Sequence, residues 1–461
     1  MTTSGSGSAP SPRPDEPSQP GQSGQPGPPS QTGPPPDPYA AETRDLLVWL
    51  VVVVVGILAA TLFVAADVRV GVDAPPFEGV LEFTADGALL LAPLVAAAVL
   101  WPALRRAHER LSWFTLLGTA WLAGLAWIAA LAAVDGSARL ERSVTGPGGF
   151  AEDTSDVRAD PTGFVDSYVS DLASLSESSQ QRPPGPALLV AGLDAIGLNS
   201  PQALMTVFAI AGSLVIPLFA LSVRALCHEP TARRLLPLVV LAPYGVWIAV
   251  SVDAVTALLV ALAIAAGTYG SRPGGSPWWA GLAGVLTGVG ALMSYGVAWL
   301  GLSVLAVYFV RRRPLLPIWS GIGALIPLVV MQALGFGYYE GLTASREADD
   351  TFQAERSPLV WAVLAVLLVA LCCGPAIIAS LRKILKTPGW PFMLGATLGI
   401  ATSILLGLAR GGMEWAWLPY FPWLLVAAVA PVPRTGEPTP TPLRLVAVGA
   451  VTGAVLAVSI H

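Results

Sequence analysis

The chain has 461 residues and a formal net charge of −5 at pH 7. Of these residues, 54% are hydrophobic and 12% are charged, whereas an ordinary soluble domain carries about 25% charged residues. Apolar runs of roughly 18 to 24 residues recur, each long enough to cross about 30 Å of hydrocarbon. The composition excludes a soluble globular domain and predicts an all-α polytopic membrane protein with about 11 to 13 transmembrane helices. No nucleic-acid partner is expected.

The N-terminal segment, residues 1–42, is rich in Pro, Gly and Ser and has almost no side chain to bury. Such a segment cannot offset its ordering entropy, so we expect a disordered tail on the cytoplasmic side. It has no basic start and no early apolar core, so it is not predicted to be a signal peptide. The tail is expected to be passive, and recruitment of a partner by the tail is the alternative.

Apolar runs bounded by Gly, Pro or polar residues predict the helices of the remaining chain. Residues 234–270 are predicted to form two helices around Ser251-Val252-Asp253, and residues 277–310 two short helices hinged at Ser294-Tyr295-Gly296. The predicted crossings are 46–66, 87–103, 113–134, 204–226, 234–251, 253–270, 277–294, 296–311, 314–337, 358–380, 389–407, 415–431 and 445–460.

The distribution of charge predicts the orientation of these crossings. The loops between the predicted crossings are basic on one side of the membrane and acidic on the other. The acidic loops span residues 67–86, 135–177 and 340–355. With a cytoplasmic N-terminus, all basic clusters fall on the cytoplasmic side, as the positive-inside rule requires, and the C-terminus falls outside. We therefore predict a multi-pass protein of the cell (plasma) membrane. The basic clusters are Arg105, Arg106 and Arg110; Arg233 and Arg234; Arg311, Arg312 and Arg313; and Arg382, Lys383 and Lys386.

The external loop over residues 135–203 is the longest loop that we expect to be ordered. Its residues 164–176 place apolar side chains on one helical face, which predicts an amphipathic helix on the membrane surface. The stretch "QQRPPGPALL" at residues 180–189 ends that helix, because it carries three prolines and a glycine. The run 186–198 is too short to span, so it is predicted to be a second interfacial or re-entrant helix. Asn199-Ser200-Pro201 then starts the next crossing.

This order of elements resembles the GT-C class of integral membrane glycosyltransferases. That class includes protein O-mannosyltransferases, aminoarabinose transferases and uncharacterised actinobacterial members. Three further stretches carry the resemblance. They are "EPTARRLLPLVVLAPYGVWIAVSVDAVTALLVALAIA", "AGLAGVLTGVGALMSYGVAWLGLSVLAVYFVRRR" and "GMEWAWLPYFPWLL".

The resemblance implies a division of the chain. A GT-C-like core spans residues 111–431 and contains the external loop 135–203. Residues 43–110 hold two additional N-terminal transmembrane helices. Residues 432–461 hold a C-terminal linker and the last transmembrane helix.

The resemblance also implies an activity. GT-C enzymes transfer a sugar from a polyprenyl phosphate to a hydroxyl, so the partners would be the lipid bilayer, a lipid-linked sugar donor and a cell-envelope glycan, lipid or protein acceptor. The acceptor hydroxyl needs a general base, and the leaving phosphate needs a cation or hydrogen-bond donors. No cofactor is assigned. No CxxC motif or Cys/His cluster indicates a metal site, although a divalent metal ion stays open.

Candidate site residues follow from these two needs. Asp156 and Glu152 lie where the resemblance places the catalytic base, with a merely solvated acidic loop as the alternative. Arg182 is suited to a phosphate because its guanidinium is planar and permanently charged, and snorkelling to lipid headgroups is the alternative. Asp253, Arg410 and Glu414 are the other predicted substrate-binding residues. An ionisable group at membrane depth is usually functional or paired, which applies to Asp253 if it lies there; the alternative is that Asp253 lies at the external surface, where a charge carries no such cost.

Two alternatives to the enzyme remain at this stage. One is a catalytically inactive GT-C-like scaffold of an envelope-assembly complex, which the Pro-rich tail leaves open. The other is a lipid or glycan transporter. The sequence does not show the matching halves with broken helices that many transporters have.

Overall fold

The described part of the chain is built from helices. The computed structural model describes residues 2, 38–66, 68–83, 87–431 and 436–460. Within them regular structure is helical, and strand-like pairing is limited to three isolated β-bridges. The predicted tail over residues 1–42 lies outside the described residues except for Thr2 and residues 38–42, which belong to α1. The predicted all-α class is confirmed.

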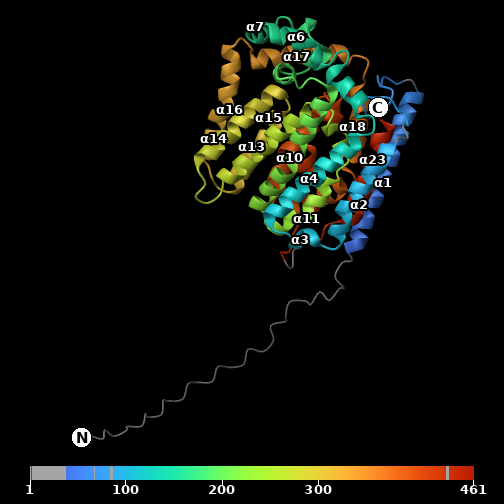
Figure 1. Ribbon diagram of the computed structural model, residues 1–461, viewed down its shortest axis with the longest axis vertical. Helices are drawn as coiled ribbons and strands as arrows, with labels where there is room; N and C mark the ends of the chain where they lie inside the picture. Colours follow the sequence, from blue (N-terminus) through green and yellow to red (C-terminus); the bar gives the residue numbers. More distant parts are fainter. Residues whose placement is uncertain (1, 3–37, 67, 84–86, 432–435, 461) are drawn as a thin grey trace, which may run out of the picture.

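Most of the predicted crossings coincide with long apolar helices that lie side by side in one bundle (Figure 1). Among the described residues, six helices have the length and composition to cross a membrane, or seven if the bent pair α18–α19 counts as one. The bundle helices are α1 (Pro38–Ala65), α2 (Leu91–Leu104), α4 (Trp113–Ala132), α10 (Pro201–Cys227), α13 (Asp253–Gly270), α14 (Pro277–Met293), α15 (Val297–Val310), α16 (Leu316–Ala333), α18 (Pro358–Cys373), α20 (Trp390–Leu405) and α23 (Leu443–Ser459).

Three predicted crossings are not continuous helices. The run 358–380 is one of them, because α18 and α19 (Ala376–Lys383) meet there at a bend of 105°. The run 234–251 divides into α11 (Glu229–Val240) and α12 (Gly245–Ile248), and 415–431 contains only α21 (Met413–Ala416), α22 (Phe421–Leu424) and a 3₁₀ turn at Val426–Ala428. Prolines lie at the breaks, and Pro243 and Pro419 supply no backbone N–H to continue a helix.

The irregular backbone at these breaks is buried in protein, where other segments complete its hydrogen bonds. The backbone N–H of Tyr244 donates to the carbonyl of Cys372 at 2.9 Å. The hydroxyl of Ser380 donates to the carbonyl of Leu424 at 2.5 Å and accepts from the N–H of Ala427 at 3.2 Å. Ser380 belongs to α19 (Ala376–Lys383), which bends by 105° from α18. The broken segments therefore support one another.

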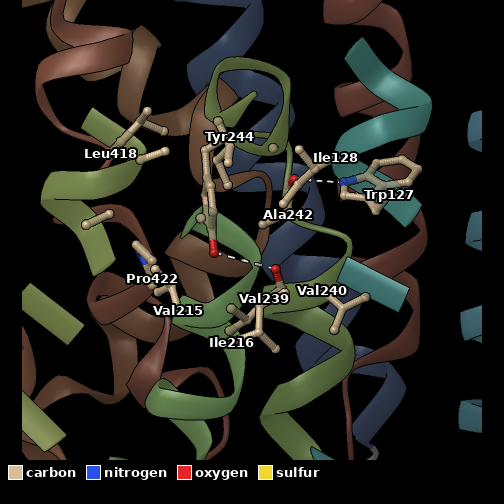
Figure 2. Close-up of a pocket in the computed structure, with 15 residues that line it drawn as sticks. Trp127, Ile128, Val215, Ile216, Val239, Val240, Ala242, Tyr244, Leu418 and Pro422 are labelled. Carbon is tan, nitrogen blue, oxygen red and sulfur yellow. Dashed lines mark hydrogen bonds between the residues drawn. The ribbon is translucent and has the colours of Figure 1, made fainter. Parts of the chain in front are cut away.

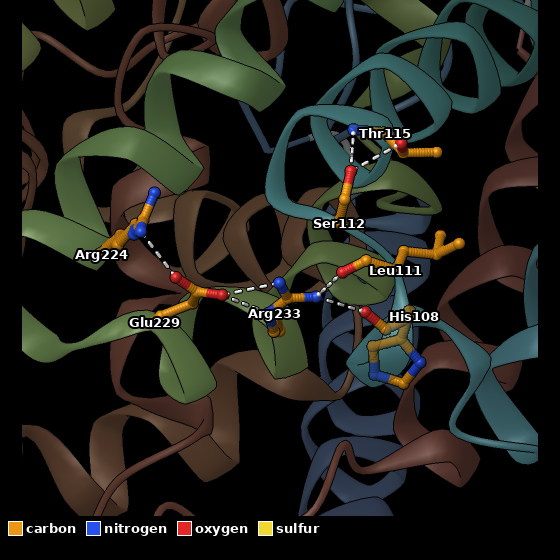
Figure 3. Close-up of polar contacts among 7 residues, drawn as sticks. All are labelled: His108, Leu111, Ser112, Thr115, Arg224, Glu229 and Arg233. Carbon is orange, nitrogen blue, oxygen red and sulfur yellow. Dashed lines mark hydrogen bonds and ion pairs between the residues drawn. The ribbon is translucent and has the colours of Figure 1, made fainter.

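Arginine side chains tie the helix ends together at the end of the bundle that carries α3 (Ala107–Arg110) and α11 (Figure 3). Arg233 donates to Glu229 at 2.6 Å and to the carbonyls of His108 and Leu111 at 3.0 and 2.9 Å. Glu229 also pairs with Arg224 at 2.7 Å. These contacts satisfy carbonyl groups that the end of a helix leaves without partners.

The other basic clusters lie at the same end. Arg311 donates to the carbonyl of Ala225 at 2.5 Å, next to the Arg224–Glu229 pair. Arg382 pairs with Asp45 at 2.6 Å, near the start of α1. The four basic clusters therefore share one end of the bundle, as the charge pattern predicted.

The loop 135–203 and α17 (Tyr338–Phe352) cover the opposite end (Figure 1). The prediction of one surface helix over 164–176 is wrong. α7 ends at Ser167, and a turn and a 3₁₀ segment at Leu172–Ser174 follow. The apolar side chains Phe164 and Tyr168 are buried against Phe336 instead of facing lipid. The short elements of the loop are α5 (Gly136–Leu140), a π turn (Glu141–Thr145), a 3₁₀ turn (Phe150–Asp153), α6 (Thr154–Ala159), α7 (Pro161–Ser167), α8 (Glu177–Gln180) and α9 (Gly185–Ala195).

The N-terminal helices pack directly on the rest of the bundle. Trp49 of α1 donates its indole N–H to the carbonyl of Ala370 in α18 at 2.8 Å. In the connection after α1, the Val70 carbonyl accepts from the indole of Trp361 at 3.0 Å. The ring of Phe77 stacks on Trp247, with 5.0 Å between centroids. Val70, Ala74 and Phe77 of the connection between α1 and α2 are therefore buried against the bundle.

Candidate functional site

The turn at "QQRPPGP" is held rigidly against the end of the bundle. Pro183 and Pro184 fix φ near −65°, and α9 begins directly after them at Gly185. The backbone of Arg182 is anchored on both sides, since its N–H donates to the Ser179 carbonyl at 3.2 Å and its carbonyl accepts from the Tyr168 hydroxyl at 3.0 Å. The backbone of Arg182 is therefore held in place on both sides of the residue.

Glycine at position 185 permits this close packing. A Cβ atom there would lie 2.2 Å from the carbonyl oxygen of Leu292, near the end of α14. No side chain can occupy that space without moving backbone. The turn is therefore seated on the break between α14 and α15, the hinge that the sequence predicted at residues 294–296.

Arg182 and Asp253 form an ion pair although 71 residues separate them. Nη1 of Arg182 lies 2.7 Å from each carboxylate oxygen of Asp253. Asp253 is fully buried, and the Arg182 side chain is 18% exposed. Asp253 is also the first residue of α13, where the helix dipole favours a negative charge, and the Ser251 hydroxyl lies 3.3 Å from it. The structure thus brings together two residues that the sequence singled out separately.

Aromatic side chains lie at this end of the bundle, and one of them contacts Arg182. The Arg182 guanidinium lies 5.9 Å from the centre of the Phe150 ring. The hydroxyl of Tyr420 donates to the carbonyl of Gly296 at 2.6 Å, which satisfies a carbonyl at the α14–α15 break. The rings of Tyr295 and Tyr338 pack edge to face at 5.3 Å. Among the described residues the guanidinium hydrogen-bonds Asp253 through Nη1 alone, so its other nitrogens can donate to a ligand.

The predicted catalytic carboxylates occupy a different position. Glu152 and Asp156 are both exposed on the surface of the loop. The buried carboxylate between them is Asp153, whose oxygens accept from the Ser176 N–H at 3.0 Å and the Ser179 hydroxyl at 2.5 Å. Asp153 therefore holds the loop together. A base role for Asp156 or Glu152 stays a prediction.

Arg410 and Glu414 belong to a second polar cluster, which was not predicted from the sequence. Its other members are Glu78, Asp350 and Arg356. Arg356 pairs with Glu78 at 2.6 Å and donates to the Arg410 carbonyl at 2.8 Å. Arg410 pairs with Asp350 at 3.2 Å. The fully buried Glu414 accepts from the Glu78 N–H at 2.7 Å. Burial, and then the nearby Glu78 carboxylate, raise the pKa of Glu414 to about 8.

This second cluster depends on backbone that only glycine adopts easily. Gly411 has a φ of +132°, and a Cβ atom there would lie 2.1 Å from Nη1 of Arg356. Arg410 was predicted as a site residue from the sequence. The contact of Glu78 with Arg356 was not predictable, because 278 residues separate the two.

An enclosed cavity within the bundle does not serve as a substrate site (Figure 2). Its volume is about 20 Å³, which is close to the space for a single water molecule. Its wall is almost entirely apolar, and the hydrogen bonds of Trp127 to the Ala242 carbonyl and of Tyr244 to the Val239 carbonyl occupy the polar groups there. A sugar or a lipid phosphate has neither room nor partners in it.

The described residues hold no group of three or more His, Cys, Asp or Glu side chains that could bind a metal ion. The fold and its apolar helices define a multi-pass, all-helical membrane protein.

No protein-family model and no curated protein matches the chain. Two crystal structures of ArnT from Cupriavidus metallidurans are similar to it. The apo form has a TM-score of 0.42 and 19% identity, covering 66% of this chain and 58% of that chain. The form bound to undecaprenyl phosphate has a TM-score of 0.41 and 18% identity, covering 68% and 59%. The chain therefore spans less than two thirds of the length of either structure.

Proposed function

We propose that this protein is a GT-C-class membrane glycosyltransferase that moves a sugar from a polyprenyl-phosphate donor to a cell-envelope glycan, lipid or protein. The proposal includes a plasma-membrane location with the N-terminus in the cytoplasm, a core over residues 111–431 and an outward-facing site. The Arg182–Asp253 pair is the observation that carries it. A buried ion pair at the end of a bundle, held by a Pro-Pro turn, presents a cation where the phosphate of a membrane-anchored donor would lie.

The chemistry requires three tasks at this end of the bundle. Asp253 positions the guanidinium of Arg182 through Nη1, and the remaining nitrogens of Arg182 donate to the donor phosphate. As the bond between sugar and phosphate breaks, the phosphate keeps the electron pair and Arg182 stabilises its charge. The acceptor hydroxyl attacks the sugar carbon and loses its proton to a carboxylate, for which Asp156 and Glu152 are the proposed bases.

Sugar transfer from polyprenyl-phosphate donors in membranes tests this proposal. Arg182→Ala removes a charge-assisted hydrogen bond worth about 1.5–3 kcal/mol, so we expect a roughly 10- to 150-fold loss of kcat/KM. Arg182→Lys should recover only part of the rate, because lysine lacks the planar fork. Asp156→Asn should reduce transfer with no effect on stability, since Asp156 is exposed. Arg346→Ala, an exposed arginine on α17, is the matched control.

Two outcomes would contradict the proposal. Full transfer by Arg182→Ala would reject the phosphate role of Arg182. Absence of transfer by the wild type with every donor tried would favour an inactive scaffold, for which the Arg182–Asp253 pair would be structural only.

A further inference from the structure

An open pocket lies in the second cluster, away from Arg182. Its volume is about 480 Å³, within the range of small-ligand sites. Three chain segments form it: the connection after α1, the turn between α17 and α18, and the turn after α20. The first two are joined by the Ser357 N–H, which donates to the Arg69 carbonyl at 2.9 Å. The lining residues are Val68, Arg69, Ala354, Arg356, Ser357, Pro358 and Arg410.

The wall of this pocket is positively charged. It contains three arginines and no carboxylate. Arg356 and Arg410 have acidic partners outside the wall, in Glu78 and Asp350. The exposed Arg69 has no ion pair among the described residues.

The start of α18 adds two features that favour an anion. Ser357 is the N-cap of this 16-residue helix, and its hydroxyl makes no capping hydrogen bond. The positive end of the helix dipole therefore faces the pocket, and a hydroxyl beside it is available to donate. Together with the guanidinium of Arg69, these groups can donate to the oxygens of a phosphate.

Exposed apolar side chains lie close in sequence to the residues that line the pocket. Leu359 follows Pro358 directly and is 83% exposed, and Leu405, before the Arg410 turn, is 82% exposed. Val68, in the wall itself, is also exposed. A ligand with a phosphate and apolar chains would bury both kinds of surface. A free phosphate would leave the leucines uncovered.

We propose that this pocket binds the phosphate group of a membrane lipid, with the phosphate among Arg69, Arg356 and Arg410 and the acyl chains against Leu359 and Leu405. This site is distinct from the proposed transfer site, and binding at it requires no sugar donor. Its occupant would join the N-terminal connection to the start of α18 and the turn after α20.

Lipid binding to the purified, delipidated full-length protein tests this inference. The probes are phosphatidic acid, diacylglycerol with the same acyl chains, and inorganic phosphate, with bound lipid measured by native mass spectrometry. We expect phosphatidic acid to bind at least about 10-fold more tightly than diacylglycerol, because only the former makes charge-assisted hydrogen bonds. Arg69→Gln should reduce that preference by roughly 10-fold, and Arg69→Glu should reduce it further.

Arg346→Gln is the control, because Arg346 is an exposed arginine on α17 that does not line the pocket. Arg69 is preferred to Arg356 for substitution, since removing Arg356 would leave Glu78 unpaired. Displacement of phosphatidic acid by equimolar inorganic phosphate would identify the phosphate alone, from a soluble source, as the recognised group. Equal binding of phosphatidic acid and diacylglycerol, or equal effects of the Arg69 and Arg346 variants, would overturn the proposal.

Discussion

The Arg182–Asp253 pair should dominate the stability of its end of the bundle. Removing one partner of a buried pair costs about 3–5 kcal/mol, because the other charge is left buried and alone. For Arg182→Gln we expect about 3 kcal/mol, the lower end, since the Arg182 side chain is 18% exposed and water can reach the site. Asp253→Asn should cost less, about 1–2 kcal/mol, because the remaining arginine can turn toward water. The double variant leaves no charge and should cost little more than either single change.

A double-mutant cycle measures this coupling. The unfolding entropy of about 2 cal/mol/K per residue makes 1 kcal/mol equivalent to roughly 1 °C in a chain of 461 residues, so Arg182→Gln should lower Tm by about 3 °C. Thermal unfolding of the four purified proteins should give a coupling energy of about 1 kcal/mol. Additive effects, with a coupling below about 0.5 kcal/mol, would refute the ion pair. If the double variant is stable and still inactive in transfer, the charge of Arg182 acts on substrate and not only on the fold.

Three further predictions concern the same end of the molecule. A cysteine at the exposed Ser174 should react with an impermeant thiol reagent in intact cells, and labelling only after lysis would reverse the proposed orientation. Burial raises the pKa of Asp349 from 3.8 to about 6. The stability that depends on a protonated Asp349 is therefore fully present below about pH 4, and the protein loses it as the pH rises through about 6. Asp349→Asn should remove this loss and gain about 2 kcal/mol relative to wild type between pH 4 and 7, and parallel pH–stability curves would contradict that assignment. Gly185→Ala should destabilise the protein by about 1–3 kcal/mol in chemical unfolding, since its methyl group would meet the Leu292 carbonyl, and an unchanged midpoint would contradict the close packing.

Local signals in the sequence predicted most of the elements. Ser200 caps α10 through its side chain, and the Ser251-Val252-Asp253 break and the 294–296 hinge lie where polar residues interrupt apolar runs. The run 415–431 was predicted as a crossing because it is apolar throughout. Its prolines determine the structure instead, and hydrogen bonds from α19 make the irregular backbone tolerable.

The candidate site was less predictable, because its contacts join distant residues. Arg182 and Asp253 were each visible as a charge in an apolar context, but no periodicity relates positions 71 residues apart. The predicted surface helix failed for a related reason. An apolar stripe indicates burial without identifying the partner, and here the partner is Phe336 rather than lipid.

The packing of the connection after α1 limits where this chain can be divided into separately folding parts. Trp361, Trp247 and Arg356 all follow residue 111, yet the groups that contact them, Val70, Phe77 and Glu78, all precede it. A chain shortened to residue 111 would lose an indole acceptor, an aromatic stack and a salt bridge together. Residues 43–110 are therefore expected to fold together with the rest of the described chain and not as a separate unit.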